Sequence, residues 1–206
     1  MKPTTAEMRE LKRRDPALGR AMRGLPPFPD FPVGNLRGSH FHALARSITY
    51  QQLATKAAAA IYGRVRDLTS GSGFPTAQQV LALSDDELRG AGLSRGKTRA
   101  IKDLAAKTVN GDLGLRSIGR HGNEEVIRRL TTVWGIGEWT AHMFLIFKLG
   151  RPDVMPAGDL GVQEGIRILD GLDKRPEPEY LLARAEVWRP LRSVAAWFLW
   201  RLTDKR

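Results

Sequence analysis

The sequence predicts an all-α protein. Apolar residues recur at helical spacing along most of the 206-residue chain. The sustained alternation of polar and apolar residues that a half-buried strand requires is absent. Residue types that favour helix N-termini precede several of the apolar runs. The chain is long enough for one substantial core or for two small helical lobes.

The N-terminal part carries two helix starts and a linker. Thr5 is a residue type that favours the N-cap, and the Asp15-Pro16 pair adds a proline suited to a first helical turn. Residues 24–38 are rich in proline and glycine, which predicts a linker. Ser39 then stands where it would cap the next helix. The apolar face of that helix, with i, i+3, i+4 and i+7 spacing, is formed by Phe41, Leu44, Ala45 and Ile48.

The middle of the chain shows a series of cap signals. A second helix runs through "QQLATKAAAAIYGRV", two capping boxes follow, and a longer helix ends at Asn110-Gly111. The side chains expected to close the first turns are Thr55, Thr76 with Gln79, Ser84 with Glu87, and Ser94.

The C-terminal part continues the helical pattern. Asn123 opens a helix with acids in its first turn and arginines in its last, as the helix dipole prefers. A Gly-Ile-Gly turn leads into "EWTAHMFLIFKL", and a loop then leads into "LGVQEGIRIL". Two further helices are expected over residues 177–186 and 191–202.

Composition narrows the function classes. There are 33 Lys and Arg against 22 Asp and Glu, a net charge of +11, which favours a polyanionic partner such as nucleic acid over a basic protein with a merely solvated surface. The absence of cysteine excludes disulfides, thiol catalysis and cysteine-ligated metal sites. The chain contains no run of eighteen apolar residues, the length that could span a membrane. The charged N-terminus lacks an apolar signal core. A cytoplasmic protein is expected, associated with the nucleoid if it is bacterial.

Residues 123–149 form a helix, a tight turn and a second helix. Gly135 and Gly137 permit positive φ and close backbone approach, and Ile136 would pack inward. Amides at the start of the second helix could hold a phosphate without any side chain. An ordinary αα-hairpin with a glycine C-cap is the alternative for this pattern taken alone.

The wider context resembles the helix-hairpin-helix DNA glycosylases. "LTTVWGIGEWTA" is similar to their L-x-x-x-x-G-I-G-x-x-T-A hairpin, and "VMPAGDLGVQ" supplies an aspartate downstream, in a loop that leads into a helix. "ARSITYQQLATKAA" resembles their early helix pair, and "LSRGKTRAIKDLA" their K-x-x-x-I/L-x-x-L-A helix. "WRPLRSVAAWFLWR" resembles the last helix of the 3-methyladenine DNA glycosylase II branch. The resemblance covers roughly Ser39 to Arg201.

This resemblance implies a two-lobed helical fold without the N-terminal β domain of the relative. One lobe would comprise residues 45–150 and contain the hairpin. The other would comprise residues 1–44 and 151–206. The active-site cleft is expected between the two lobes.

The resemblance also implies a catalytic carboxylate. Asp159 takes the place of the family's aspartate, with Asp153 of the same loop as the rival. Capping of the following helix is the structural alternative for Asp159, and the two roles are compatible.

The base pocket is implied in the same way. Trp139, Trp200 and Met143 would line it. The strand-cleaving branch has a lysine at the position of Trp139, so its absence implies hydrolysis of the glycosidic bond alone. Trp188 and Trp197 are expected in the core, and Trp134 is expected to support the hairpin.

DNA contacts are expected from the hairpin and from an early corner. The implied DNA-binding residues are Gly135, Gly137, Thr140, Gln52 and Leu53. Gln52 is the closest match to the family's wedge, and a polar residue between two helices is its structural alternative. The implied ligands of a monovalent cation, Na⁺ or K⁺, are the backbone carbonyls of Thr131, Val133 and Ile136.

The resemblance therefore implies a monofunctional DNA-3-methyladenine glycosylase of base excision repair. It would act on double-stranded DNA as a monomer, with no required cofactor, no nucleotide and no membrane. Two alternatives stay open: a related glycosylase for another damaged base, and a non-enzymatic helix-hairpin-helix DNA-binding protein.

Overall fold

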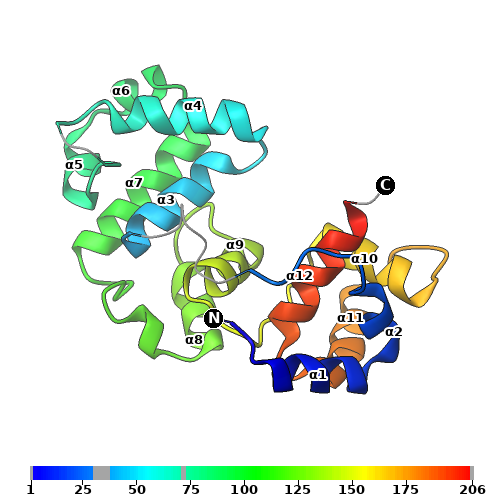
Figure 1. Cartoon of the computed structure of the whole chain (residues 1–206). Helices are drawn as coiled ribbons and strands as arrows, with labels where there is room; N and C mark the ends of the chain where they lie inside the picture. Colours follow the sequence, from blue (N-terminus) through cyan, green and yellow to red (C-terminus); the bar gives the residue numbers. More distant parts are fainter. Residues whose placement is uncertain (1, 30–37, 71–72, 205–206) are drawn as a thin grey trace. The chain divides into compact units, whose positions relative to one another are not determined.

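A computed structural model describes residues 2–29, 38–70 and 73–204 (Figure 1). The described residues form helices and no strands, which confirms the all-α class. None of the helices in these ranges is long and apolar enough to cross a membrane. The chain divides into two compact units, which we call the terminal unit (Met1–Gly34 with Leu145–Arg206) and the central unit (Asn35–Phe144).

The units divide at residues 34/35 and 144/145, whereas the sequence-based boundaries were at residues 44/45 and 150/151. A boundary at residue 45 would cut through helix α3 (His40–Tyr50), all of which belongs to the central unit. The second boundary falls inside a π-helical turn, Phe144–Lys148, where the sequence predicted an ordinary helix. The expected cleft between the lobes stays a prediction.

The central unit is built around its longest helix, α7, which packs against α3, α5 and α6. The side chains of Ile101 and Leu104 on α7, and of Leu44 and Ile48 on α3, are fully buried, so the predicted apolar face of α3 is confirmed. Besides α3, the helical elements are α4 (Thr55–Arg66), α5 (Ala77–Ala82), α6 (Asp85–Gly90), α7 (Arg95–Val109), the short turn η2 (Ile118–Arg120), α8 (Asn123–Leu130) and α9 (Glu138–Met143).

The terminal unit joins the two ends of the chain. Helices α10 and α12 make its closest packing, because Gly165 on α10 has no side chain where the carbonyl oxygen of Leu199 on α12 approaches. A Cβ at Gly165 would lie 2.6 Å from that oxygen. Its helical elements are α1 (Thr5–Arg14), α2 (Pro16–Ala21), α10 (Leu160–Asp170), α11 (Pro178–Ala185), η4 (Glu186–Trp188) and α12 (Arg192–Thr203).

Asp15 fastens the N-terminal helices to the C-terminal segment. Its buried carboxylate accepts hydrogen bonds from the Leu18 amide (3.0 Å), the Arg184 guanidinium (2.6 Å) and the Trp188 indole (2.8 Å). Burial alone would raise the pKa of Asp15, but these donors outweigh it and hold the pKa below its usual value. The predicted cap is thus also a buried ionic anchor.

Most predicted caps are confirmed. Asp15, Ser39 and Ser94 each accept an N-terminal amide, and both capping boxes form. Two predictions were wrong. Thr4 caps α1, because Glu7 at the third helical position completes a capping box with Thr4 and not with Thr5. Thr55 is the first helical residue of α4, whose N-cap is Ala54 and carries no side-chain cap. Of the predicted linker, residues 30–37 lie outside the described ranges.

Candidate functional site

Asp159 occupies the N-cap of α10, as the sequence predicted. Its Oδ1 accepts the Val162 amide at 2.9 Å and the Trp200 indole N–H at 2.8 Å. A carboxylate at a helix N-terminus is stabilised by the helix dipole. Two donors from two helices therefore fix the orientation of this carboxylate.

The position of the Trp200 ring depends on stacking against Phe147 and on the absence of a side chain at Gly161. Its ring stacks on Phe147, with centroids 5.6 Å apart and an interplanar angle of 26°. A Cβ on Gly161 would lie 2.9 Å from Cδ1 of Trp200, so this position admits only glycine without displacing the ring. The sequence identified Trp200 as a pocket aromatic but missed its hydrogen bond to Asp159 and the part of Gly161. A glycine in the first turn of α10, where no positive φ requires it, was the available signal.

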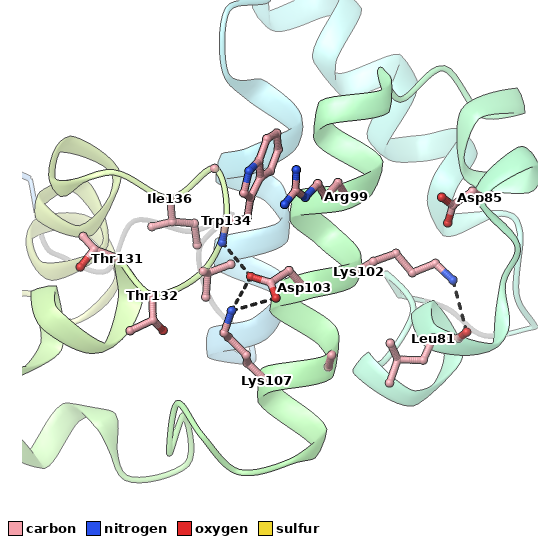
Figure 2. A pocket seen from close by; sticks show the side chains of 13 residues that line it. Leu81, Asp85, Arg99, Lys102, Asp103, Lys107, Thr131, Thr132, Trp134 and Ile136 are labelled. Atoms are coloured by element: carbon pink, nitrogen blue, oxygen red, sulfur yellow. Dashed lines mark hydrogen bonds and ion pairs between the residues drawn. The ribbon is translucent and has the colours of Figure 1, made fainter.

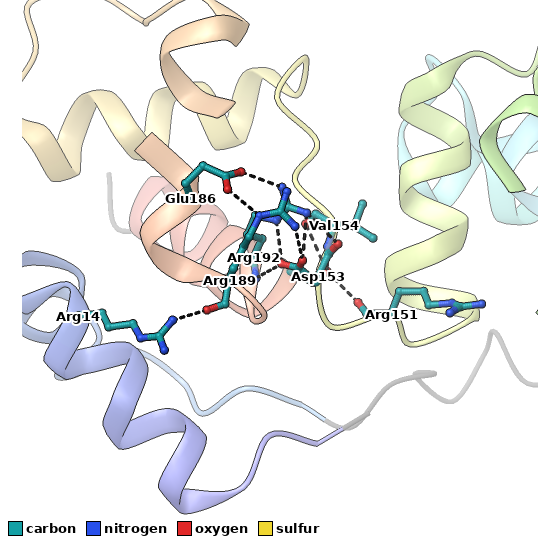
Figure 3. A network of polar contacts seen from close by, with 8 residues as sticks. Arg14, Arg151, Asp153, Val154, Glu186, Arg189 and Arg192 are labelled. Atoms are coloured by element: carbon teal, nitrogen blue, oxygen red, sulfur yellow. Dashed lines mark hydrogen bonds and ion pairs between the residues drawn. The ribbon is translucent and has the colours of Figure 1, made fainter. Parts of the chain in front are cut away.

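Asp153, the rival carboxylate, lies in a network of ion pairs with Arg189 and Arg192 (Figure 3). Arg192 donates to both of its oxygens, at 2.7 Å and 3.0 Å, in a paired geometry that holds carboxylates strongly. Arg189 adds a third contact at 3.1 Å. Arg189 and Arg192, which both also pair with Glu186, therefore tie the loop of Asp153 to the start of α12.

The hairpin between α8 and α9 needs its first glycine on two counts. Gly135 has φ of +80°, and a Cβ there would lie 3.1 Å from the Cβ of Ala100 on α7. Ile136 is buried, as predicted. Gly137 is the N-cap of α9 and offers no side-chain cap to the first amides of that helix.

A groove of about 980 Å³ runs between α7 and the hairpin (Figure 2). At its centre Asp103 accepts the backbone N–H of Trp134 at 2.7 Å and the ammonium group of Lys107 at 2.7 Å. Burial would raise the pKa of Asp103, but these donors lower it on balance, so the carboxylate stays ionised. Trp134 lies against α7 with the Arg99 guanidinium 4.5 Å from its ring centroid. The sequence assigned hairpin support to Trp134 but gave no signal for Asp103.

A second cavity, of about 510 Å³, lies within the central unit. It collects several predicted residues, among them Trp139 and Met143. Trp139 is 49% exposed. Tyr50, which the sequence missed, carries the Arg46 guanidinium 3.9 Å from its centroid. The complete lining is Arg46, Ser47, Tyr50, Gln51, Gln52, Trp139, Thr140 and Met143.

The three remaining predicted DNA contacts differ in exposure. Gln52 and Leu53 are exposed at the corner between α3 and α4. Thr140 is only 3% exposed, and its hydroxyl accepts a hydrogen bond from the Gln51 amide at 3.3 Å. Thr140 thus supports the hairpin from within.

Comparison with known proteins places this architecture in a family. Residues 45–190 match the HhH-GPD superfamily of base excision DNA repair proteins. The chain belongs to this superfamily. It is 38% identical over 177 residues to DNA-3-methyladenine glycosylase 1 of Schizosaccharomyces pombe, covering 82% of this chain and 78% of the relative.

Two solved structures agree with the fold. The S. pombe 3-methyladenine DNA glycosylase in complex with abasic DNA superimposes with a TM-score of 0.82 at 34% identity, over 97% of each chain. A DNA-3-methyladenine glycosidase of Bacillus halodurans gives 0.80 at 34% identity, over 97% of this chain and 90% of that one.

The expected cation site of this HhH-GPD chain lies in the turn before Gly137. The Val133 carbonyl accepts the Ile136 amide at 3.0 Å, and the second lone pair of that oxygen is compatible with a cation. Neutral carbonyl oxygens suit a hard monovalent ion. Over the ranges that the structure describes, no group of three or more His, Asp or Glu side chains could hold a metal.

Proposed function

We propose that this chain is a DNA glycosylase of base excision repair that hydrolyses the N-glycosidic bond of alkylated bases in double-stranded DNA. Membership of the superfamily supports this, as do relatives named for 3-methyladenine. The net charge of +11 fits a DNA partner. The substrates are bases of the 3-methyladenine and 7-methylguanine type.

The observation that carries the mechanism is the fixed Asp159 carboxylate. Bases methylated in this way are cationic and already good leaving groups, so the developing charge on the sugar is what needs stabilisation. A carboxylate about 4 Å from that charge contributes about 4 kcal/mol at an effective dielectric near 20. That energy corresponds to roughly a thousandfold in rate. Asp159 would also orient the attacking water.

The proposed reaction ends with base release. Trp139 stands where the resemblance places the lysine of the strand-cleaving branch, and an indole cannot form a Schiff base. The strand is therefore left intact at an abasic site.

Recognition of the base follows from its charge. The target base leaves the duplex before it is cut. The face of the exposed Trp139 ring attracts a cation.

The remaining parts of the proposal concern surroundings. The protein would act as a monomer in the cytoplasm, without a nucleotide or a required cofactor. A Na⁺ or K⁺ ion on the carbonyls of Thr131, Val133 and Ile136 would strengthen the phosphate grip of the hairpin.

Base release from methylated duplex DNA tests this proposal. Chromatography of the freed bases is expected to show 3-methyladenine and 7-methylguanine, with the strand cut only after alkali. Borohydride should trap no covalent adduct. A protein that binds the duplex but frees no base would be a non-enzymatic DNA-binding protein. Release only from duplexes with oxidised guanine or mismatched thymine would identify a different glycosylase.

A further inference from the structure

The corner between α3 and α4 holds an unusual backbone conformation at its tip. Gln52 has φ of +55°, and it is the one non-glycine residue with positive φ in the part of the chain that the structure describes. A long side chain rarely adopts this left-handed region, so the surrounding structure must enforce it. The side chain of Gln52 is exposed.

Lys97 of α7 holds the peptide that enters Gln52. Its Nζ donates to the carbonyl of Thr49 at 2.8 Å and to the carbonyl of Gln51 at 2.7 Å. An ammonium group suits this place, because the last carbonyls of α3 lack helical partners and carry the negative end of the dipole. Since a peptide unit is planar, fixing the Gln51 oxygen also fixes the amide nitrogen of Gln52.

Gln51 ties the same corner to the hairpin. Its side-chain amide donates to the Gly135 carbonyl at 3.1 Å and to the Thr140 hydroxyl at 3.3 Å. Gly135 lies in the turn and Thr140 in α9. Two segments assigned to DNA contact, far apart in sequence, are thereby held in one fixed arrangement within the central unit.

We propose that Lys97 and Gln51 are positioning residues that set Gln52 as the wedge, holding its side chain ready to fill the space left by an extruded base and in register with the phosphate-holding hairpin. The inference rests on the proposed function. It assigns a role to Lys97, the first lysine of the "KTRAIKDLA" stretch, which takes no part in the proposed catalytic steps.

The test separates wedge placement from general stability. Single-turnover excision of 7-methylguanine is measured in two duplexes, one with cytosine opposite and one with an abasic analogue opposite, where no base pair needs to be broken. Lys97→Met and Gln51→Met keep side-chain length but lose the donors. Lys97→Met is expected to slow excision from the paired duplex by about tenfold to a hundredfold, with little change for the unpaired duplex. Gln51 also lines the cavity beside Trp139, so Gln51→Met is expected to slow both reactions, and the paired duplex more than the unpaired one.

Lys102→Met is the matched control. Lys102 is also on α7 and also caps a helix end, because its ammonium donates to the carbonyls of Leu81 and Leu83 at the end of α5. Lys102→Met therefore removes the same charge and the same kind of contact as Lys97→Met. The ratio of the two excision rates should stay at the wild-type value in this variant.

A double-mutant cycle identifies the residue through which Lys97 acts. In a Gln52→Gly background, where the wedge is already lost, Lys97→Met should cause no further change in the ratio. An unchanged ratio in Lys97→Met and Gln51→Met, equal losses on both duplexes, or an undiminished effect in the Gln52→Gly background would each overturn the proposal. If Lys97→Met fails to fold, Gln51→Met carries the test, because Gln51 is only half-buried.

Failure of the proposed function is distinguishable. If the wild type frees no base from either duplex, the glycosylase assignment fails. The positioning role of Lys97 and Gln51 is then tested by the affinity of each variant for a duplex with a tetrahydrofuran abasic site, relative to its affinity for an undamaged duplex. A loss of affinity that is confined to the abasic duplex supports the positioning role. Equal affinities of wild type and variants for the abasic duplex, or equal losses on both duplexes, overturn it.

Discussion

At the scale of single residues, the charge and the shape of Asp159 have separate consequences. Asp159→Asn keeps the N-cap, because Asn caps as well as Asp, so the melting temperature and the affinity for abasic DNA should persist. Loss of the negative charge should slow single-turnover excision of 3-methyladenine by about two to three orders of magnitude. The measurement pairs the excision rate with a melting curve.

Asp153→Asn is the matched control for that variant. It makes the same chemical change in the same loop but weakens the contacts with Arg189 and Arg192. It should lower stability and leave the excision rate of the folded protein near the wild-type value. Near-normal excision by Asp159→Asn, with a large loss in Asp153→Asn, would reverse the assignment.

Trp200 offers a finer test of how the carboxylate is oriented. Trp200→Phe keeps a ring that can stack on Phe147 but removes the N–H that donates to Asp159. A hydrogen bond to a charged group contributes about 1.5–3 kcal/mol, so excision should fall by about tenfold or more. Trp197→Phe, at a buried position on the same helix, should change the melting temperature instead. An unchanged excision rate for Trp200→Phe would mean that the indole N–H has no part in orientation.

The sequence predicted single residues where the governing rule is local. The cap of α10 by Asp159 spans three residues, and a cap rule identifies it. The bond from Trp200 to Asp159 spans 41 residues, and the bond from the Trp134 amide to Asp103 spans 31. Contacts at such separations depend on how helices pack, which residue spacing does not encode. For the same reason Tyr50 and Arg46 were missed beside the predicted Trp139.

At the scale of helices, the contact between α10 and α12 depends on one glycine. Gly165→Ala would place a Cβ 2.6 Å from a backbone oxygen, so the helices must separate, and stability should fall by about 1–3 kcal/mol. Gly63→Ala in α4 is the control, because no atom lies within 4 Å of its Cβ position. That variant should gain about 0.5–1 kcal/mol from helix propensity. Urea unfolding of both variants checks the opposite signs.

The junction at Asp15 predicts a dependence of stability on pH. Hydrogen-bond donors lower the pKa of this buried carboxyl in the folded protein. The ionised group therefore stabilises the fold above the pKa of Asp in the unfolded chain, about 3.9. This stabilisation is lost as the pH falls through the lower pKa of the folded state. Asp15→Asn should cost about 1–3 kcal/mol at pH 7. The difference from wild type should shrink below about pH 4. A constant difference down to pH 3 in urea unfolding would contradict this.

The order and type of the helices were predictable because caps and apolar spacing agree along the chain. Cap residues were misplaced where two threonines adjoin, at Thr4 and Thr5, since only the partner Glu7 decides between them. The π-helical turn at Phe144–Lys148 was not predictable. One extra residue in a turn leaves an apolar run looking like an ordinary helix.

At the scale of the whole molecule, the net charge of +11 should dominate binding to undamaged DNA. The affinity should depend little on sequence and should fall linearly in a plot of log affinity against log salt. If about six phosphates are neutralised, affinity should drop roughly a thousandfold between 50 and 200 mM salt. Fluorescence anisotropy with two unrelated duplexes measures this, and an affinity independent of salt would refute it.

The left-handed backbone at Gln52 bears on how the proposed wedge would search DNA for damage. A repair protein meets vast numbers of intact base pairs for each damaged one, and its encounters are brief. A probe that had to refold at every step would lose time and binding energy at each of them. With Gln52 as the proposed wedge, a tip already held by Lys97 and Gln51 would press on each pair without rearranging first, so weakened pairs would yield first and inspection would be fast.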